Sequence, residues 1–174
     1  MINETKSTRT KLGNILYEKT YKASSFLYEH MWLYYLLNYT WGIITTLIGW
    51  VAIAIVYCLP KKVVVEKSKF GPAHYAILGN NWGGVSLGIN FFVADKMGKD
   101  WTLHTKKHEL GHTFQNAIFG PFAIFLIYIP SCIRYWYREF SKKVQPPYDL
   151  IWFEGSATEI GTQYISYINK NKEK

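Results

Sequence analysis

The chain has 174 residues, a length that fits one domain. Its 20 Lys and Arg against 12 Asp and Glu give a formal charge of +8, which suits an anionic partner such as a membrane surface. The basic residues are scattered and no RNA- or DNA-binding motif is present, so we expect no nucleic-acid partner. The two cysteines exclude a disulfide framework and a metal site built on a C-x-x-C pair.

Residues 31–60 carry no charged side chain, and their second part, residues 41–59, is almost wholly apolar. Nineteen helical residues span about 28 Å, which is close to the hydrocarbon thickness of a bilayer. Pro60 would end such a helix, and Lys61-Lys62 would mark the membrane boundary. The run therefore predicts one transmembrane helix, with a buried core helix as the alternative.

Residues 63–98 have the composition of β-strands rather than of an apolar helix. β-branched and aromatic side chains are frequent in three runs, Val63–Val65, Ala73–Leu78 and Val85–Val93. A glycine-rich segment, residues 79–84, separates the last two runs. This pattern predicts a β-hairpin or a small antiparallel sheet. A phosphate-binding loop is the alternative for the glycines, but no helix start and no Lys-Ser/Thr pair follow them.

The pentad His108-Glu109-Leu110-Gly111-His112 has the H-E-x-x-H pattern, in a segment that we expect to be helical. Residues four apart lie on one face of a helix, so His108 and His112 can bind one zinc ion. Glu109 can then act as the general base that takes a proton from zinc-activated water. The alternative is a solvated helical turn in which two histidines occur by chance.

The residues around the pentad predict a helix with two different faces. At 100° per residue, one narrow stripe suits a core and the opposite side suits a cleft. The core stripe is Leu103, Leu110, Phe114 and Ala117, and the cleft side is His104, His108, His112 and Gln115. Gly111 leaves room for another element to approach closely, and Gly120-Pro121 ends the helix.

A second charge-free stretch follows, with a strongly apolar segment at about residues 119–133. It could lie in or against the membrane, form a second span, or pack in the core; we favour the membrane. Basic and aromatic residues then alternate over residues 134–143, which suits lipid headgroups or a solvated helix face.

A third zinc ligand is expected among His104, Asp149, Glu154 and Glu159. His104 lies eight residues from His112, about 12 Å along a helix, so both cannot reach one ion. Asp149 follows Pro146-Pro147 and is expected in a turn. Glu154 and Glu159 lie on one predicted helix, about 140° apart, so only one of them can face the cleft.

An ordered set of short motifs resembles a group of small uncharacterised bacterial membrane proteins with a zincin-like, or gluzincin-like, metallopeptidase site. The set consists of His108-Glu109-x-Gly111-His112-x-x-Gln115, Gly120-Pro121, Ile129-Pro130-Ser131 and Glu154-x-x-Ala157, within residues 73–161. The resemblance implies that Glu154 is the third zinc ligand. It also implies that Thr158 stands where such sites have an acid that orients a histidine.

We therefore expect an α+β protein in which an N-terminal segment and transmembrane helix (residues 1–60, span about 41–59) precede a zincin-like domain (residues 61–174). The expected function is that of a membrane-anchored, zinc-dependent metallopeptidase, single-pass in the bacterial inner membrane. Its zinc would be held by His108, His112 and Glu154, its base would be Glu109, and its partners would be membrane lipid and a peptide substrate along an edge strand.

Two other function classes remain open from the sequence. One is a catalytically inactive metal-binding membrane protein with an interaction or immunity role. The other is a membrane or nucleic-acid binding module in which the pentad is incidental.

Overall fold

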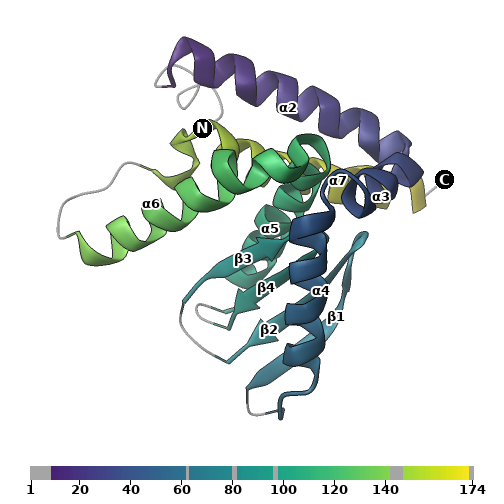
Figure 1. The fold of residues 1–174 in the computed structure, drawn as a ribbon, viewed down its shortest axis with the longest axis vertical. Helices are drawn as coiled ribbons and strands as arrows, with labels where there is room; N and C mark the ends of the chain where they lie inside the picture. The colour runs from purple at the N-terminus through teal and green to yellow at the C-terminus, as the bar shows by residue number, and fades with distance from the viewer. Residues whose placement is uncertain (1–8, 62, 80–81, 96–97, 142–146, 173–174) are drawn as a thin grey trace.

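The computed structural model describes residues 9–61, 63–79, 82–95, 98–141 and 147–172 (Figure 1). This part of the chain is mostly helical, with a small sheet. The helices are α2 (Lys11–Glu29), α3 (Met31–Tyr39), α4 (Ile43–Tyr57), α5 (Lys99–Phe119), α6 (Ile129–Phe140) and α7 (Trp152–Lys172). Short helical turns η1 (Gly120–Phe122) and η2 (Ile124–Tyr128) join α5 to α6, and η3 (Tyr148–Leu150) precedes α7.

The sheet has the order β1-β2-β4-β3, with β1 at Val64–Phe70, β2 at Ala73–Leu78, β3 at Gly84–Leu87 and β4 at Asn90–Ala94. β2 and β4 are parallel, whereas β1 with β2 and β3 with β4 are antiparallel hairpins, so the sheet is mixed and the predicted antiparallel pairing across the glycine-rich segment is wrong. The segment expected as one strand, Val85–Val93, turns back at Gly88, whose φ of +61° is accessible to glycine without strain. This turn places β3 at an edge of the sheet.

The expected fold class, with an N-terminal transmembrane helix over residues 41–59, is also wrong. The chain bends by 88° between α3 and α4, and the 15 residues of α4 extend only about 22 Å. Among the described residues, no single helix is long and apolar enough to cross a bilayer. Two helix pairs meet that requirement only when joined across sharp bends: α3 with α4, and Lys99–Phe122 with Ile124–Phe140 at 116°.

The N-terminal helices pack on the rest of the chain. α2 lies along α7, α3 contacts α5, and α4 crosses one face of the sheet (Figure 1). The main core gathers Leu110 and Phe114 of α5 with Tyr34, Phe91 and Ala117, all fully buried. Leu103, expected in the same stripe, is 45% exposed, so the predicted stripe does not continue into the first turn of α5.

Two helices have an inverted amphipathic pattern. α4 turns small and polar residues toward the sheet, namely Thr45, Thr46 and Gly49 with Ile53, while larger apolar side chains face outward. The outward residues of α4 are Ile44, Leu47, Ile48, Val51 and Ile55. No residue of α6 is buried, and its outward side carries Ile129, Ile133, Trp136, Tyr137 and Phe140.

Candidate metal centre

The site depends on a close crossing of α5 and α7. Gly111 lies against the carbonyl of Ala157, and Gly161 lies against the carbonyl of Lys107, with no room for a Cβ at either glycine. The expectation that Gly111 allows another element to approach closely agrees with this packing. The contact brings the first turn of α7, which carries Glu154, to the pentad on α5.

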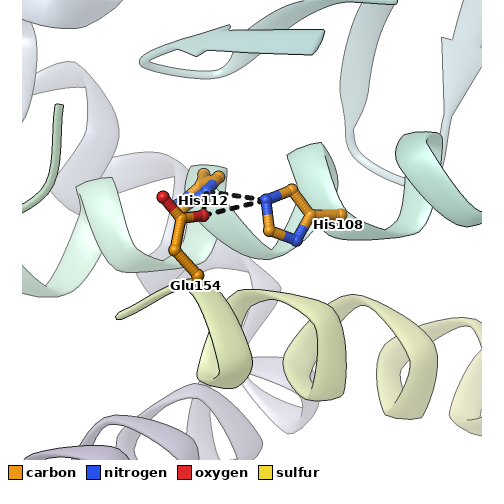
Figure 2. Close-up of side chains that lie close together, drawn as sticks. All are labelled: His108, His112 and Glu154. Atoms are coloured by element: carbon orange, nitrogen blue, oxygen red, sulfur yellow. Dashed lines mark hydrogen bonds and ion pairs between the residues drawn. The ribbon is translucent and has the colours of Figure 1, made fainter. Parts of the chain in front are cut away.

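The three residues expected as zinc ligands lie together, with their nitrogen and oxygen atoms turned inward (Figure 2). The two Nε2 atoms of His108 and His112 are 3.1 Å apart. Glu154 Oε2 is 3.1 Å from the first and 3.2 Å from the second. Ligand atoms about 2.0–2.1 Å from a tetrahedral zinc lie about 3.3 Å from each other. The triangle therefore has nearly the size that zinc requires.

Hydrogen bonds determine which nitrogen of each histidine faces the centre. The amide of Gln115 donates to Phe153 O at 2.7 Å, so its Oε1 accepts from His112 Nδ1, also at 2.7 Å. Thr158 Oγ1 lies 2.8 Å from His108 Nδ1 and 3.2 Å from Asp149 Oδ1, to which it can donate. Both Nδ1 atoms thus carry hydrogen, and both Nε2 lone pairs face the same point.

Glu154 is fully buried and is oriented by Ser131, which was not among the predicted site residues. Ser131, at the start of α6, donates to Glu154 Oε1 at 2.5 Å, which leaves Oε2 for the histidines. The hydroxyl of Tyr148 lies 3.2 Å from Ser131 Oγ. Ser131 belongs to the Ile129-Pro130-Ser131 motif, so that motif was the available signal.

Burial and pairing have opposite effects on the two kinds of ligand. Burial alone would lower the pKa of His108, but the hydrogen bond and charge of Glu154 raise it to about 9. Burial alone would raise the pKa of Glu154, but its hydrogen bonds with His108 and His112 hold that pKa well below its usual range. The pocket thus favours an anionic carboxylate beside a positive charge, which a bound cation can supply.

Glu109 lies next to this triangle and is not one of its corners. Ser86 on β3 has its hydroxyl 2.7 Å from Glu109 Oε2 and 2.7 Å from Glu109 O. Gly84 leaves the space that the Glu109 carboxylate occupies, because a Cβ there would overlap it. Burial raises the pKa of Glu109, and the nearby histidines oppose that rise. These features suit a proton acceptor rather than a ligand.

A cleft of about 380 Å³ opens onto His108 and Glu109. Its walls come from the segment before and at the start of β3, from α5, from α6 and from Tyr148. A larger cavity of about 830 Å³ lies between α2, α3 and the end of α5, and it contains none of the candidate site residues. We place the chemistry in the smaller cleft because the polar groups converge there.

The other candidate ligands lie outside the triangle. His104 is exposed and lines the cleft one turn before His108. Glu159 bonds to Gln163 on the partly exposed side of α7. Asp149 is in η3, where it supports Thr158 instead of reaching the centre.

The donor set fits zinc. Two imidazole nitrogens and one carboxylate oxygen are the three protein ligands of a common class of catalytic zinc site, which leaves a fourth position open. Each ligand also has the outer hydrogen-bond partner that holds metal-binding side chains in place, namely Gln115, Thr158 or Ser131. A surface cluster of three titratable side chains would not need that degree of support.

Comparison of the chain with protein-family models, with curated protein sequences and with solved structures finds no match. The resemblance to small bacterial membrane proteins with a zincin-like site therefore stays a prediction. The geometry of His108, His112, Glu154 and Glu109 has to carry the functional argument on its own.

Proposed function

We propose that the protein is a zinc-dependent hydrolase of the metallopeptidase kind, which cleaves a peptide bond. The observation that carries this proposal is the triangle of two Nε2 atoms and one carboxylate oxygen, 3.1–3.2 Å on each side, with His108 and the neighbouring Glu109 lining one cleft. Zinc in this triangle would supply Lewis acidity, lowering the pKa of a water molecule in its open position and polarising a carbonyl.

The residues of the chain would divide the remaining work. His108, His112 and Glu154 hold the metal, and their outer partners keep the ring and carboxylate orientations fixed. Glu109 accepts the proton from the attacking water and then delivers it to the leaving amine. Its position supports this role, because the carboxylate lies beside the triangle without being a corner of it and lines the cleft.

The cleft suits an extended peptide. β3 is an edge strand, no described strand pairs with its outer side, and Gly84 at its start lines the cleft. A substrate strand could add to this edge through backbone hydrogen bonds. Tyr148 lies in the same cleft, with its ring centre 6.1 Å from that of His108, so its hydroxyl is our candidate donor to the carbonyl oxygen.

We place this activity at a membrane surface, with lipid and a peptide substrate as partners. The outward apolar faces of α4 and α6 support this location, since soluble monomers rarely expose apolar patches of such extent. The net charge of +8 is consistent with anionic lipid.

The test is metal analysis of the purified full-length protein, followed by peptide hydrolysis with and without a zinc chelator. We expect about one zinc per chain and hydrolysis that a chelator abolishes and added zinc restores. Zinc without hydrolysis of any peptide would favour a catalytically inactive metal-binding protein. Protein without zinc, and with unchanged stability on zinc addition, would contradict the proposal.

A further inference from the structure

We propose that the substrate is a peptide segment tethered to a bilayer, and that α6 separates the cleft from the lipid in which its own outer face is embedded. This inference deepens the proposed function and rests on it for the reaction. It concerns where the scissile peptide must lie, which the metal ligands alone do not determine.

α6 has two faces with different roles. At 100° per residue, Ile129, Ile133, Trp136 and Phe140 fall within a sector of about 60°. Ile133 is 65% exposed and Phe140 is 78% exposed. Large apolar groups are therefore on the side that the rest of the chain leaves uncovered.

The opposite side of α6 faces the site. Ser131 bonds to the metal-binding carboxylate, and Tyr135 donates to Trp82 O at 2.7 Å, just before β3. Tyr135 and Arg138 line the cleft. One helix thus forms a wall of the cleft with its polar side and presents its apolar side outward.

The apolar side of α6 continues onto α4. Trp41, at the corner between α3 and α4, contacts Phe122 of η1 with ring centres 5.9 Å apart. Both side chains are exposed, and Phe125 and Leu126 of η2 extend the surface toward α6. In Figure 1, α4 begins close to the segment that joins α5 to α6, and α4 contacts η1 of that segment. We call this combined set of outward residues of α4, Trp41, η1, η2 and α6 the apolar face.

The chemistry of the apolar face fits a bilayer. Trp41, Trp136 and Tyr137 are residue types that anchor proteins at the membrane–water interface. α4 carries no charged residue, so its outward side offers lipid tails nothing but apolar groups. The net charge of +8 on the whole chain complements anionic lipid headgroups.

The position of α6 then restricts the substrate. A helix with its side chains is about 10 Å across, so the cleft would lie about that distance from the lipid in contact with the outer side of α6. A peptide strand between β3 and α6 would run close to the bilayer surface. A segment adjoining its own membrane anchor reaches this place at high effective concentration, whereas a free peptide does not.

The experiment uses full-length, zinc-loaded protein with vesicles of phosphatidylcholine and phosphatidylglycerol. One peptide sequence is made in two forms, with an N-terminal palmitoyl chain and with an acetyl group. We expect about tenfold or greater preference for the palmitoylated form on vesicles, in line with gains from tethering. The double variant Ile133→Ser/Phe140→Ser should lose vesicle co-sedimentation and this preference. The matched variant Leu12→Ser/Ile15→Ser, on exposed positions of α2, should keep both.

Equal cleavage of the two peptide forms, or full vesicle binding by the α6 variant, would overturn the inference. The inference would also be overturned if the protein did not bind vesicles and instead self-associated through the same residues, as measured by light scattering. Photo-crosslinking of both peptides to the Glu109→Gln variant reports binding without chemistry. If the anchored peptide crosslinks preferentially but the unmodified protein hydrolyses neither peptide, the proposed hydrolysis is contradicted. The inference that the site binds a membrane-tethered peptide is then still supported.

Discussion

The hydroxyl of Thr158 links His108 to a carboxylate that does not touch the ring itself: Thr158 Oγ1 is 2.8 Å from His108 Nδ1 and 3.2 Å from Asp149 Oδ1. The resemblance implied an acid at position 158, and the threonine at first suggests a weakened site. The structure shows a carboxylate still oriented toward His108, but acting through one intervening hydroxyl.

Removing this hydroxyl should weaken zinc binding. Thr158→Val keeps the side-chain shape but leaves His108 Nδ1 without its acceptor, so we expect a loss of about 10–100-fold in zinc affinity. Thr158→Ser should remain close to the unmodified protein. Competition titration with a fluorescent chelator measures both, and equal affinities for the valine and serine variants would show that the link to Asp149 has no effect on the metal.

Replacing the third ligand should have a larger effect. Glu154→Ala removes a proposed metal-binding oxygen, so zinc affinity should fall by more than the roughly 100-fold upper range for outer partners. His104→Ala and Glu159→Ala serve as matched controls and should keep zinc occupancy near normal, because both residues lie outside the triangle. Metal analysis after dialysis distinguishes them. Loss of zinc from Glu159→Ala, with zinc retained by Glu154→Ala, would mean that the ligand is misassigned.

Glu109→Gln should separate metal binding from catalysis. The amide cannot accept the proton from water, so hydrolysis should fall by roughly 10²–10⁴-fold, the usual contribution of a general base. Zinc content should not change, since Glu109 is not a corner of the triangle. Steady-state rates and metal content are measured on the same sample, and a fully active variant would remove Glu109 from the mechanism.

The crossing of α5 and α7 predicts a stability effect. Gly111→Ala places a methyl group against the Ala157 carbonyl, and overpacking of this kind costs about 1–3 kcal/mol. Gly13→Ala, on α2, adds the same group where the nearest atom is the Thr10 hydroxyl at 3.1 Å, a side chain that needs to shift by only a few tenths of an ångström, so its cost should be smaller than that of Gly111→Ala. Urea unfolding of both variants is the measurement. An unchanged free energy of unfolding for Gly111→Ala would contradict the close crossing.

Local patterns singled out residues that lie together in the structure, although they predicted the fold class wrongly. The helix bearing His108, His112 and Glu109 follows from spacing within one segment, and its end at Gly120 follows from a local signal. Ser131 contacts Glu154 because the start of α6 packs near the first turn of α7. The apolar pattern around Ser131 does not predict this tertiary contact. The sequence could therefore indicate a candidate metal site while omitting Ser131, which orients one of its side chains.

The errors in the fold have a related cause. The apolar run from Trp41 to Leu59 contains a helix of only 15 residues, Ile43–Tyr57, because the chain bends by 88° between α3 and α4, and counting apolar residues does not reveal where a helix begins. The parallel pairing of β2 with β4 is likewise set by β3 moving to the edge, not by adjacent residues. Periodicity describes the faces of one element, but it does not say what covers them.

Arg9, at the start of the described chain, is linked through η3 to the candidate metal centre. Its guanidinium donates to the carbonyls of Asp149 at 2.8 Å and of Leu150 at 3.1 Å, and so holds η3 in place. Because Asp149 in turn accepts from Thr158, trimming the chain past Arg9, or fusing a tag that displaces it, would loosen a support of His108. Purification tags are therefore better placed after Lys172, at the far end of α7, than at the amino terminus.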